Sequence, residues 1–194
     1  GLGDVYKRQA SFFEKHPPQG TPPWVRRVTV PGGTYVVADD VETLGWLANL
    51  AAVELHVPQW QVDQLGHPQS PDLLVFDLDP GAPADITHCS RVALLVADEV
   101  HSAHGLECHP KTSGSKGLQI YVRWDGREDT RTFAQSVAET LAHRHGDLIV
   151  ANMRKDLRRG RVLIDWSQNH PAKTTVAPYS IRANTEPTVS TPVT

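Results

Sequence analysis

The stretch Pro-Asp-Leu-Leu-Val-Phe-Asp-Leu-Asp-Pro-Gly, residues 71–81, decides the fold of this chain. Its apolar run at 73–76 is typical of a buried strand, which the Pro-Gly pair at 80–81 ends. Alternate residues of a strand point to the same face, so Asp77 and Asp79 are expected on one face. Two carboxylates this close repel each other, and a hard cation such as Mg²⁺ or Mn²⁺ would compensate them. Ordinary turn aspartates beside a Pro-Gly pair are the alternative that this stretch alone leaves open.

Composition places the chain among soluble globular proteins. Its 194 residues suffice to bury a core of ordinary size, and its formal net charge of −3 does not indicate a nucleic-acid binder, so such binding would need a local basic patch. Cys89 and Cys108 show neither metal-ligand spacing nor a disulfide framework, which fits a reducing compartment. No apolar run approaches membrane-spanning length and no segment has the order of a signal peptide, so we expect a cytoplasmic protein without membrane contact.

The pattern along the chain predicts an α+β fold, with mixed or antiparallel sheets flanked by helices. Residues 1–9 share no periodicity with the rest of the chain and are interpreted as a non-native remnant, 10–183 as the folded domain and 184–194 as an extended tail. Asp39 and Glu42 have the form of a capping box. Residues 59–72 are predicted to be a loop. Predicted helices are 39–52, 86–104 and 130–145, and predicted strands are 24–30, 34–38, 53–57, 73–79, 106–109, 118–123, 162–166 and 179–182.

Asp165 is a natural third carboxylate beside Asp77 and Asp79. It follows the apolar run Val-Leu-Ile at 162–164, where a charge is costly without a partner. Three carboxylates from two strand ends can bracket two divalent ions, which stabilise the attacking and leaving oxygens of a phosphoryl transfer. A strand-end aspartate paired with an arginine is an equally good interpretation of Asp165 alone.

Several further residues are candidates for binding phosphates or nucleic acid. The small-residue loop at 113–117 offers backbone N–H groups together with Ser113 and Lys116, which suits phosphate oxygens, although it is not a Walker A sequence. Arg182, Lys173 and His56 could also reach a triphosphate. The basic run at 154–161 and the aromatic pair that precedes Lys15 are candidate nucleic-acid contacts, the aromatics through stacking on bases. That pair is Phe12 and Phe13.

Five ordered blocks resemble one known family over nearly everything from residue 10 onward. They are Phe-Phe-Glu-Lys-His at 12–16, Asp-Leu-Leu-Val-Phe-Asp-Leu-Asp-Pro-Gly at 72–81, Lys-Thr-Ser-Gly-Ser-Lys-Gly-Leu at 111–118, Val-Leu-Ile-Asp-Trp-Ser-Gln-Asn at 162–169 and Lys-Thr-Thr-Val-Ala-Pro-Tyr-Ser-Ile-Arg-Ala at 173–183. Together they closely resemble the polymerase domain of bacterial DNA ligase D, of the archaeo-eukaryotic primase superfamily.

The resemblance implies a template-directed nucleotidyltransferase that extends primers and fills gaps at DNA ends in bacterial non-homologous end joining. It implies Mn²⁺ or Mg²⁺, nucleoside triphosphates as substrates, 5′-phosphorylated or gapped DNA ends, Ku and an attached or separate ligase as partners, and a place at the nucleoid. The implied metal ligands are Asp77, Asp79 and Asp165. The residues implied near the nucleotide are His56, Ser113, Lys116 and Arg182, and both Gln119, at the position of a family histidine, and Lys173, from its place in the chain, are further candidates.

Two departures from the family pattern carry expectations of their own. Gln119 stands where the resemblance implies a histidine near the triphosphate, and an amide can donate a hydrogen bond but cannot carry charge, so weaker triphosphate binding is expected. The chain also begins after the family's usual start and stops before its usual end, so it is expected to be a fragment.

Two alternative functions remain at this point. A phosphohydrolase of the haloacid-dehalogenase type also places Asp-x-Asp after an apolar strand, but it has Thr or Ser where this chain has Gly81. The other alternative is an end-binding module in which Gln119 marks weakened catalysis. Three retained, costly carboxylates argue against it.

Overall fold

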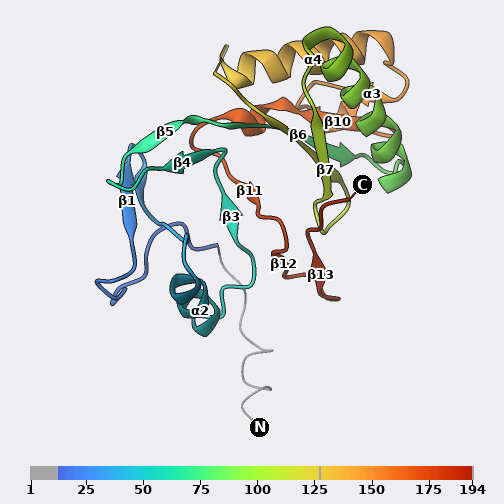
Figure 1. The fold of residues 1–194 in the computed structure, drawn as a ribbon. Helices are drawn as coiled ribbons and strands as arrows, with labels where there is room; N and C mark the ends of the chain where they lie inside the picture. The colour runs from blue at the N-terminus through green and yellow to red at the C-terminus, as the bar shows by residue number, and fades with distance from the viewer. Residues whose placement is uncertain (1–12, 127, 194) are drawn as a thin grey trace. The chain divides into compact units, whose positions relative to one another are not determined.

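The computed structural model describes residues 13–126 and 128–193 (Figure 1). The chain divides into two compact units, one made of residues 1–52 with 62–68 and the other of residues 53–61 with 69–194. The remnant predicted at 1–9 lies outside the described residues. Among the helices of the described residues, none combines the length and apolar character needed to cross a membrane.

The first unit contains the predicted hairpin and short helix. Strands β1 (Arg27–Val30) and β2 (Gly33–Val36) pair antiparallel, and helix α2 (Val41–Asn49) follows. The helix begins one residue later than the capping box at Asp39 predicted, because Asp40 accepts a hydrogen bond from the Thr43 backbone N–H at 2.6 Å. Asp39 instead forms an ion pair with Arg26. That expectation for Asp39 was therefore wrong.

A five-stranded mixed sheet forms the centre of the second unit. Its strand order is β7-β8-β6-β10-β9, with β6 in the middle, antiparallel to both neighbours, and β9 parallel to β10. This arrangement confirms the predicted α+β class. The strands are β6 (Leu73–Pro80), β7 (Cys108–Thr112), β8 (Leu118–Arg123), β9 (Ile149–Val150) and β10 (Val162–Asp165).

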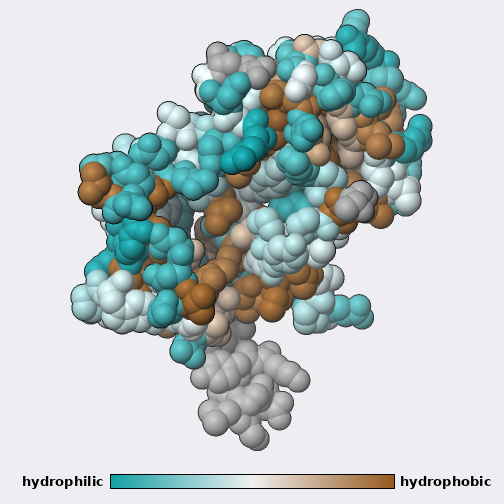
Figure 2. All heavy atoms as spheres, in the orientation of Figure 1, coloured by the Kyte–Doolittle hydropathy of each residue, from teal (hydrophilic) through white to brown (hydrophobic). Residues whose placement is uncertain are grey.

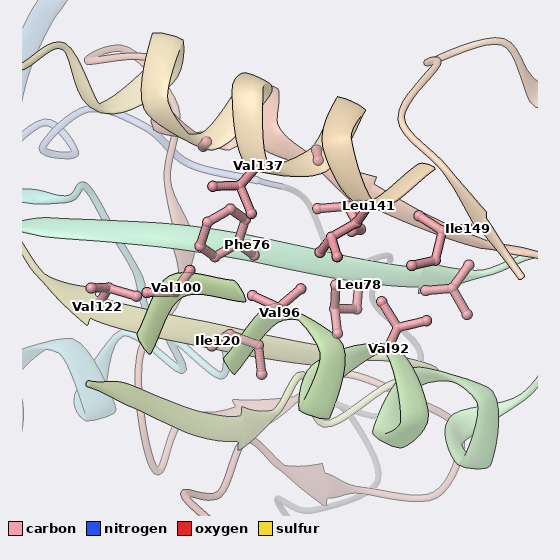
Figure 3. Close-up of a cluster of buried hydrophobic side chains, with 14 of the residues drawn as sticks. Phe76, Leu78, Val92, Val96, Val100, Ile120, Val122, Val137, Leu141 and Ile149 are labelled. Atoms are coloured by element: carbon pink, nitrogen blue, oxygen red, sulfur yellow. The ribbon is translucent and has the colours of Figure 1, made fainter. Parts of the chain in front are cut away.

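Helices α3 (Ile86–His104) and α4 (Thr130–Arg144) cover one face of this sheet (Figure 3). Asp85 caps α3, and Gly105, with a φ of 67°, ends it in the left-handed conformation that glycine tolerates best. Alternation along β6 sends Phe76 and Leu78 into the apolar layer between sheet and helices. Labelled members of that layer in Figure 3 are Phe76, Leu78, Val92, Val96, Val100, Ile120, Val122, Val137, Leu141 and Ile149.

Four short ribbons complete the part of the chain that the structure describes, and one of them corrects an expectation. Residues 59–72 were predicted to be a loop, yet they carry β4 (Trp60–Val62) and β5 (Pro68–Pro71), which pair with each other. Asp63 organises the turn by accepting hydrogen bonds from the backbone N–H groups of Leu65 and His67. The strand residues are Gln-, Pro- and Ser-rich, so they lack the apolar alternation that identifies a strand. The other ribbons are β1–β2, β3 (His56–Val57) with β11 (Thr175–Val176), and β12 (Ile181–Arg182) with β13 (Thr188–Val189).

The segment after residue 183, expected to be an extended tail, runs along β7. Thr112 donates its backbone N–H to the Thr191 carbonyl at 2.8 Å, and Val193 donates to the Pro110 carbonyl at 3.0 Å. Ser190 is completely buried. The segment therefore covers the outer edge of β7, which would otherwise present unpaired backbone groups.

The surface in Figure 2 mixes hydrophilic and apolar residues. Exposed apolar side chains include Leu94 on α3, which is 68% exposed, and Tyr179, which is 72% exposed. Single exposed apolar residues are normal on a soluble domain, so they provide matched controls for core substitutions.

Gly117 is expected to tolerate no side chain. A Cβ atom at this position would collide with the Leu78 backbone carbonyl, whereas one at Gly45, within α2, would meet no atom within 4 Å. We expect Gly117→Ala to lower the free energy of unfolding by about 1–3 kcal/mol or more. Gly45→Ala should raise it by about 0.5–1 kcal/mol, since alanine favours a helix. Thermal unfolding of both variants measures the difference, and equal shifts would contradict the close approach of β6 and β8 at Gly117.

Candidate active site

A row of polar residues crosses four neighbouring strands on the face of the sheet opposite α3 and α4. In the strand register, Asp165 of β10 lies opposite Asp77 of β6, Asp77 opposite Gln119 of β8, and Gln119 opposite Lys111 of β7. Directly paired residues of antiparallel strands share a face. Asp79, two residues after Asp77, points to the same side. The sheet therefore brings the three predicted carboxylates to one face.

The three carboxylates repel one another. Burial, together with repulsion from Asp79 and Asp165, raises the pKa of Asp77 to about 7. Burial of part of its carboxyl group, followed by repulsion from Asp165, also raises the pKa of Asp79, although the residue lies at the surface; Arg158 opposes both effects. Carboxyl groups whose pKa is raised by burial and mutual repulsion are stabilised in their ionised form by a nearby cation. A cation is therefore favoured at this cluster.

Gln119 connects Asp77 to a buried lysine. Lys111 is 2% exposed, and its Nζ donates to Gln119 Oε1 and to Ser190 Oγ, both at 2.6 Å. The Gln119 side chain in turn forms a hydrogen bond with Asp77, which lowers the pKa of that carboxyl. Burial lowers the pKa of Lys111 to about 8, against the opposing attraction of Asp77. Gln119, the predicted nucleotide contact, thus lies within the carboxylate site, 4% exposed.

Asp165 is oriented by the short helical turn that follows it, η2 (Trp166–Asn169). Its Oδ1 accepts hydrogen bonds from the Ser167 backbone N–H at 2.9 Å and the Ser167 hydroxyl at 2.6 Å, and its Oδ2 accepts from Gln168 at 3.3 Å. The predicted nucleotide contact Lys173 donates to Ser167 Oγ at 2.5 Å. Lys173 therefore contacts Asp165 indirectly, through the Ser167 hydroxyl that both of them bond.

His56 and Arg182, both predicted near the nucleotide, share one carboxylate. His56 Nε2 lies 2.9 Å from Glu54 Oε2, and Arg182 Nε lies 3.4 Å from Glu54 Oε1. The strand β3 that carries His56 pairs with β11, and Thr175 of β11 bonds the Tyr121 hydroxyl of β8 at 2.6 Å. This contact joins the β3–β11 ribbon to the face of the sheet that carries the carboxylates.

Ser113 shapes its own loop. Its hydroxyl accepts hydrogen bonds from the backbone N–H groups of Ser115 and Gly117, each at 3.2 Å. Two of the N–H groups expected to face phosphate are therefore already used, while the exposed side chain of Lys116 extends from the loop.

Of the predicted nucleic-acid contacts, Phe13 and Lys15 belong to the first unit, whereas the basic run at 154–161 belongs to the second. Phe12 lies outside the described residues, and Phe13 is 64% exposed. The Lys15 Nζ lies 6.0 Å from the centre of the Tyr35 ring. Their role toward DNA stays a prediction.

The carboxylates supply the oxygen ligands that Mg²⁺ and Mn²⁺ prefer, so the donor chemistry fits the implied cation. The raised pKa values of Asp77 and Asp79 show an acidic cluster that lacks full compensation within the protein. Among the described residues, no three His, Cys, Asp or Glu side chains are gathered closely enough to form a ready-made metal cluster. Asp77, Asp79 and Asp165 share a face of the sheet without forming a closed ligand cage. A bound cation would bring their oxygens closer together.

The pKa of Asp77 predicts a pH-dependent stability in metal-free buffer. Its folded-state value of about 7, above the ordinary 3.8, means that the folded protein binds more protons between these two pH values. Linkage then makes the Asp77 contribution to stability fall as pH rises through this window and level off above about 7. Relative to wild type, Asp77→Asn should therefore gain stability as pH rises from about 4 to about 7. Urea unfolding of both proteins at several pH values, with a chelator present, measures this difference in stability. A difference that does not change with pH would contradict the raised pKa of Asp77.

Sequence reasoning missed four residues of this site: Glu54, Lys111, Ser167 and Gln168. Lys111, Ser167 and Gln168 lie inside the five blocks that resemble the family. Glu54 shares the polar face of its strand with His56. Their positions in the sequence could therefore have marked them as candidates for the site. Their roles depend on burial and on partners distant in the chain, which residue patterns do not contain.

Comparison with known proteins gives one consistent result. The family model of the LigD primase-polymerase domain matches residues 6–194. The LigD protein of Mycobacterium tuberculosis is 42% identical over 95% of this chain, and that of Bacillus subtilis is 31% identical over 96%. This chain covers 26% and 30% of these two relatives.

A solved structure agrees with the sequence matches. The polymerase domain of Mycobacterium tuberculosis ligase D in complex with DNA superposes with a TM-score of 0.88 at 41% identity, covering 96% of this chain and 69% of that one. The match of the family model over 6–194 leaves the haloacid-dehalogenase alternative without support. The chain belongs to the LigD primase-polymerase domain family.

Proposed function

We propose that this chain is a template-directed nucleotidyltransferase that extends primers and fills gaps at DNA ends in bacterial non-homologous end joining. The observation that carries the proposal is the convergence of Asp77, Asp79 and Asp165 on one face of the sheet, in a chain of this family. The solved relative is a polymerase domain in complex with DNA, which supports DNA as the partner of this chain. Ku, a ligase and a place at the nucleoid belong to the same proposal.

The residues of the site divide between two tasks. Asp77, Asp79 and Asp165 would hold divalent cations, Mn²⁺ or Mg²⁺, which when bound activate the primer 3′-hydroxyl and neutralise the triphosphate. Arg182, Lys116 and the Ser113 hydroxyl would bind the triphosphate, with His56 beside the nucleotide. Glu54 lies within 2.9 Å of His56 Nε2 and within 3.4 Å of Arg182 Nε, so its carboxylate helps to orient two of these contacts.

Primer extension tests the proposal directly. The substrate is a gapped DNA with a 5′-phosphate, supplied with Mn²⁺ and one ribonucleotide at a time. We expect addition of the nucleotide complementary to the template base and little addition of the other three. Untemplated addition of all four at equal rates would contradict template direction. Tight DNA binding without any extension, by a folded protein, would favour the end-binding module.

Gln119→His tests the departure from the family pattern. The histidine is expected to restore a chargeable group beside the triphosphate and so to lower the KM for the nucleotide. Single-nucleotide extension at varied nucleotide concentration measures that KM. A KM equal to that of the wild-type protein would show that glutamine at this position does not weaken triphosphate binding.

A further inference from the structure

Lys111 carries a buried charge that the proposed reaction does not use. Lysine is almost never fully buried without a compensating group, because its ammonium loses its hydration. Its direct partners are neutral: the Gln119 amide oxygen, the Ser190 hydroxyl and the ring of Tyr121, whose centre lies 5.5 Å from Nζ. The attraction that compensates its charge comes from Asp77, on the far side of Gln119, while Arg182 repels it.

The chemistry of the two end groups decides which way the Gln119 amide faces. An ammonium only donates hydrogen bonds, and an ionised carboxylate only accepts them. Gln119 lies between the two in the strand register, with Lys111 opposite it on one side and Asp77 on the other. Its oxygen must therefore face Lys111, which leaves its NH₂ group to donate to Asp77. Without Lys111, nothing in this row would prevent the amide from turning its oxygen toward the carboxylate.

The C-terminal segment completes the arrangement. Ser190 is completely buried, accepts from Lys111 Nζ at 2.6 Å and donates to the Thr112 carbonyl at 2.9 Å. This hydroxyl holds the ammonium from the segment that runs along the outer edge of β7. The row therefore runs from the segment that covers β7, through Lys111 and Gln119, to the central strand.

We propose that Lys111 is a positioning residue of the polymerase site: its buried ammonium, held by Ser190, orients the Gln119 amide so that this amide donates to the Asp77 carboxylate. The proposal rests on the proposed function for its catalytic consequence only. Groups that orient metal-binding side chains typically change activity or metal affinity by about 10–100-fold when removed. Lys111 acts through Gln119 and Asp77 and, being buried, is expected to make no contact with the nucleotide.

The side-chain amide of Gln119 reports this role without any need for activity. Its NH₂ resonances, assigned by their loss in Gln119→Leu, are expected to shift in Asp77→Asn and to shift in Lys111→Met, which removes the charge at similar side-chain volume. Arg91→Met, which removes an exposed charge from α3, should leave them unchanged. Unchanged resonances in Asp77→Asn would overturn the proposal, and this arm requires no substitution of Lys111.

Kinetics then connect the orientation to catalysis. In single-nucleotide extension, Lys111→Met should lower kcat about 10-fold with a nucleotide KM within about twofold of wild type. The double variant Lys111→Met/Gln119→Leu should be no slower than Gln119→Leu alone, because both act through one amide. If the fold losses in kcat of the two single variants multiply in the double variant, the proposal is overturned. If the wild-type chain extends no primer, the proposed function fails, while the amide resonances still decide the role of Lys111.

Discussion

Asp77→Asn is expected to lower primer extension at least about 1,000-fold, equivalent to about 4 kcal/mol of transition-state stabilisation. Asparagine has the shape of aspartate and lacks its charge, so the substitution removes a proposed cation ligand from the centre of the carboxylate row. Asp77 lies on the central strand, directly opposite both Asp165 and Gln119, so no neighbouring acid can take over its position.

The same substitution should not unfold the protein. Burial and repulsion from Asp79 and Asp165 outweigh the attraction of Asp77 to Lys111 and raise the Asp77 pKa to about 7, so neutralising this carboxylate is favourable on balance in the metal-free protein. Lost extension together with equal or higher thermal stability therefore separates a catalytic effect from a folding defect. Asp98→Asn is the matched control, since Asp98 is exposed on α3, on the opposite face of the sheet. Extension by Asp77→Asn at more than a tenth of the wild-type rate would contradict the proposed role of this carboxylate.

Phe76→Ala is expected to lower the free energy of unfolding by about 3–5 kcal/mol. Phe76 is completely buried in the layer between the sheet and the two helices (Figure 3). Its removal loses the transfer energy of the ring and leaves a cavity that a close-packed core closes only in part. For a chain of this length, a change of that size corresponds to a melting temperature lower by roughly 6–20 °C.

Leu94→Ala supplies the control for this loss. Leu94 is 68% exposed on α3, so its truncation should change stability by no more than about 0.5 kcal/mol. Urea unfolding of the two variants at one pH gives both values. A loss below about 1 kcal/mol for Phe76→Ala would show that the layer does not depend on this ring, contrary to its complete burial.

The sequence by itself determined the features that depend on neighbours along the chain. The alternation of residues 73–79 predicted both faces of β6, with Phe76 and Leu78 in the core and Asp77 and Asp79 on the opposite side. The helical period and Gly105 predicted α3 with its bounds, because period, cap and stop are all local signals. The five blocks indicated the family, and the family model confirmed it.

Only the tertiary structure decided which distant residues meet. The register that places Asp165 opposite Asp77, and Gln119 between Asp77 and Lys111, arises from pairing of strands far apart in the chain. Alternation predicted the strand that contains β3, but its two-residue partner β11 is too short to carry a periodic signal, and the polar hairpin at 60–71 has no apolar alternation. The burial of Lys111 depends on Ser190, from a segment whose composition indicates only an extended chain. Local patterns record the preference of each segment, whereas burial and cross-strand contacts are fixed only when the whole sheet has formed.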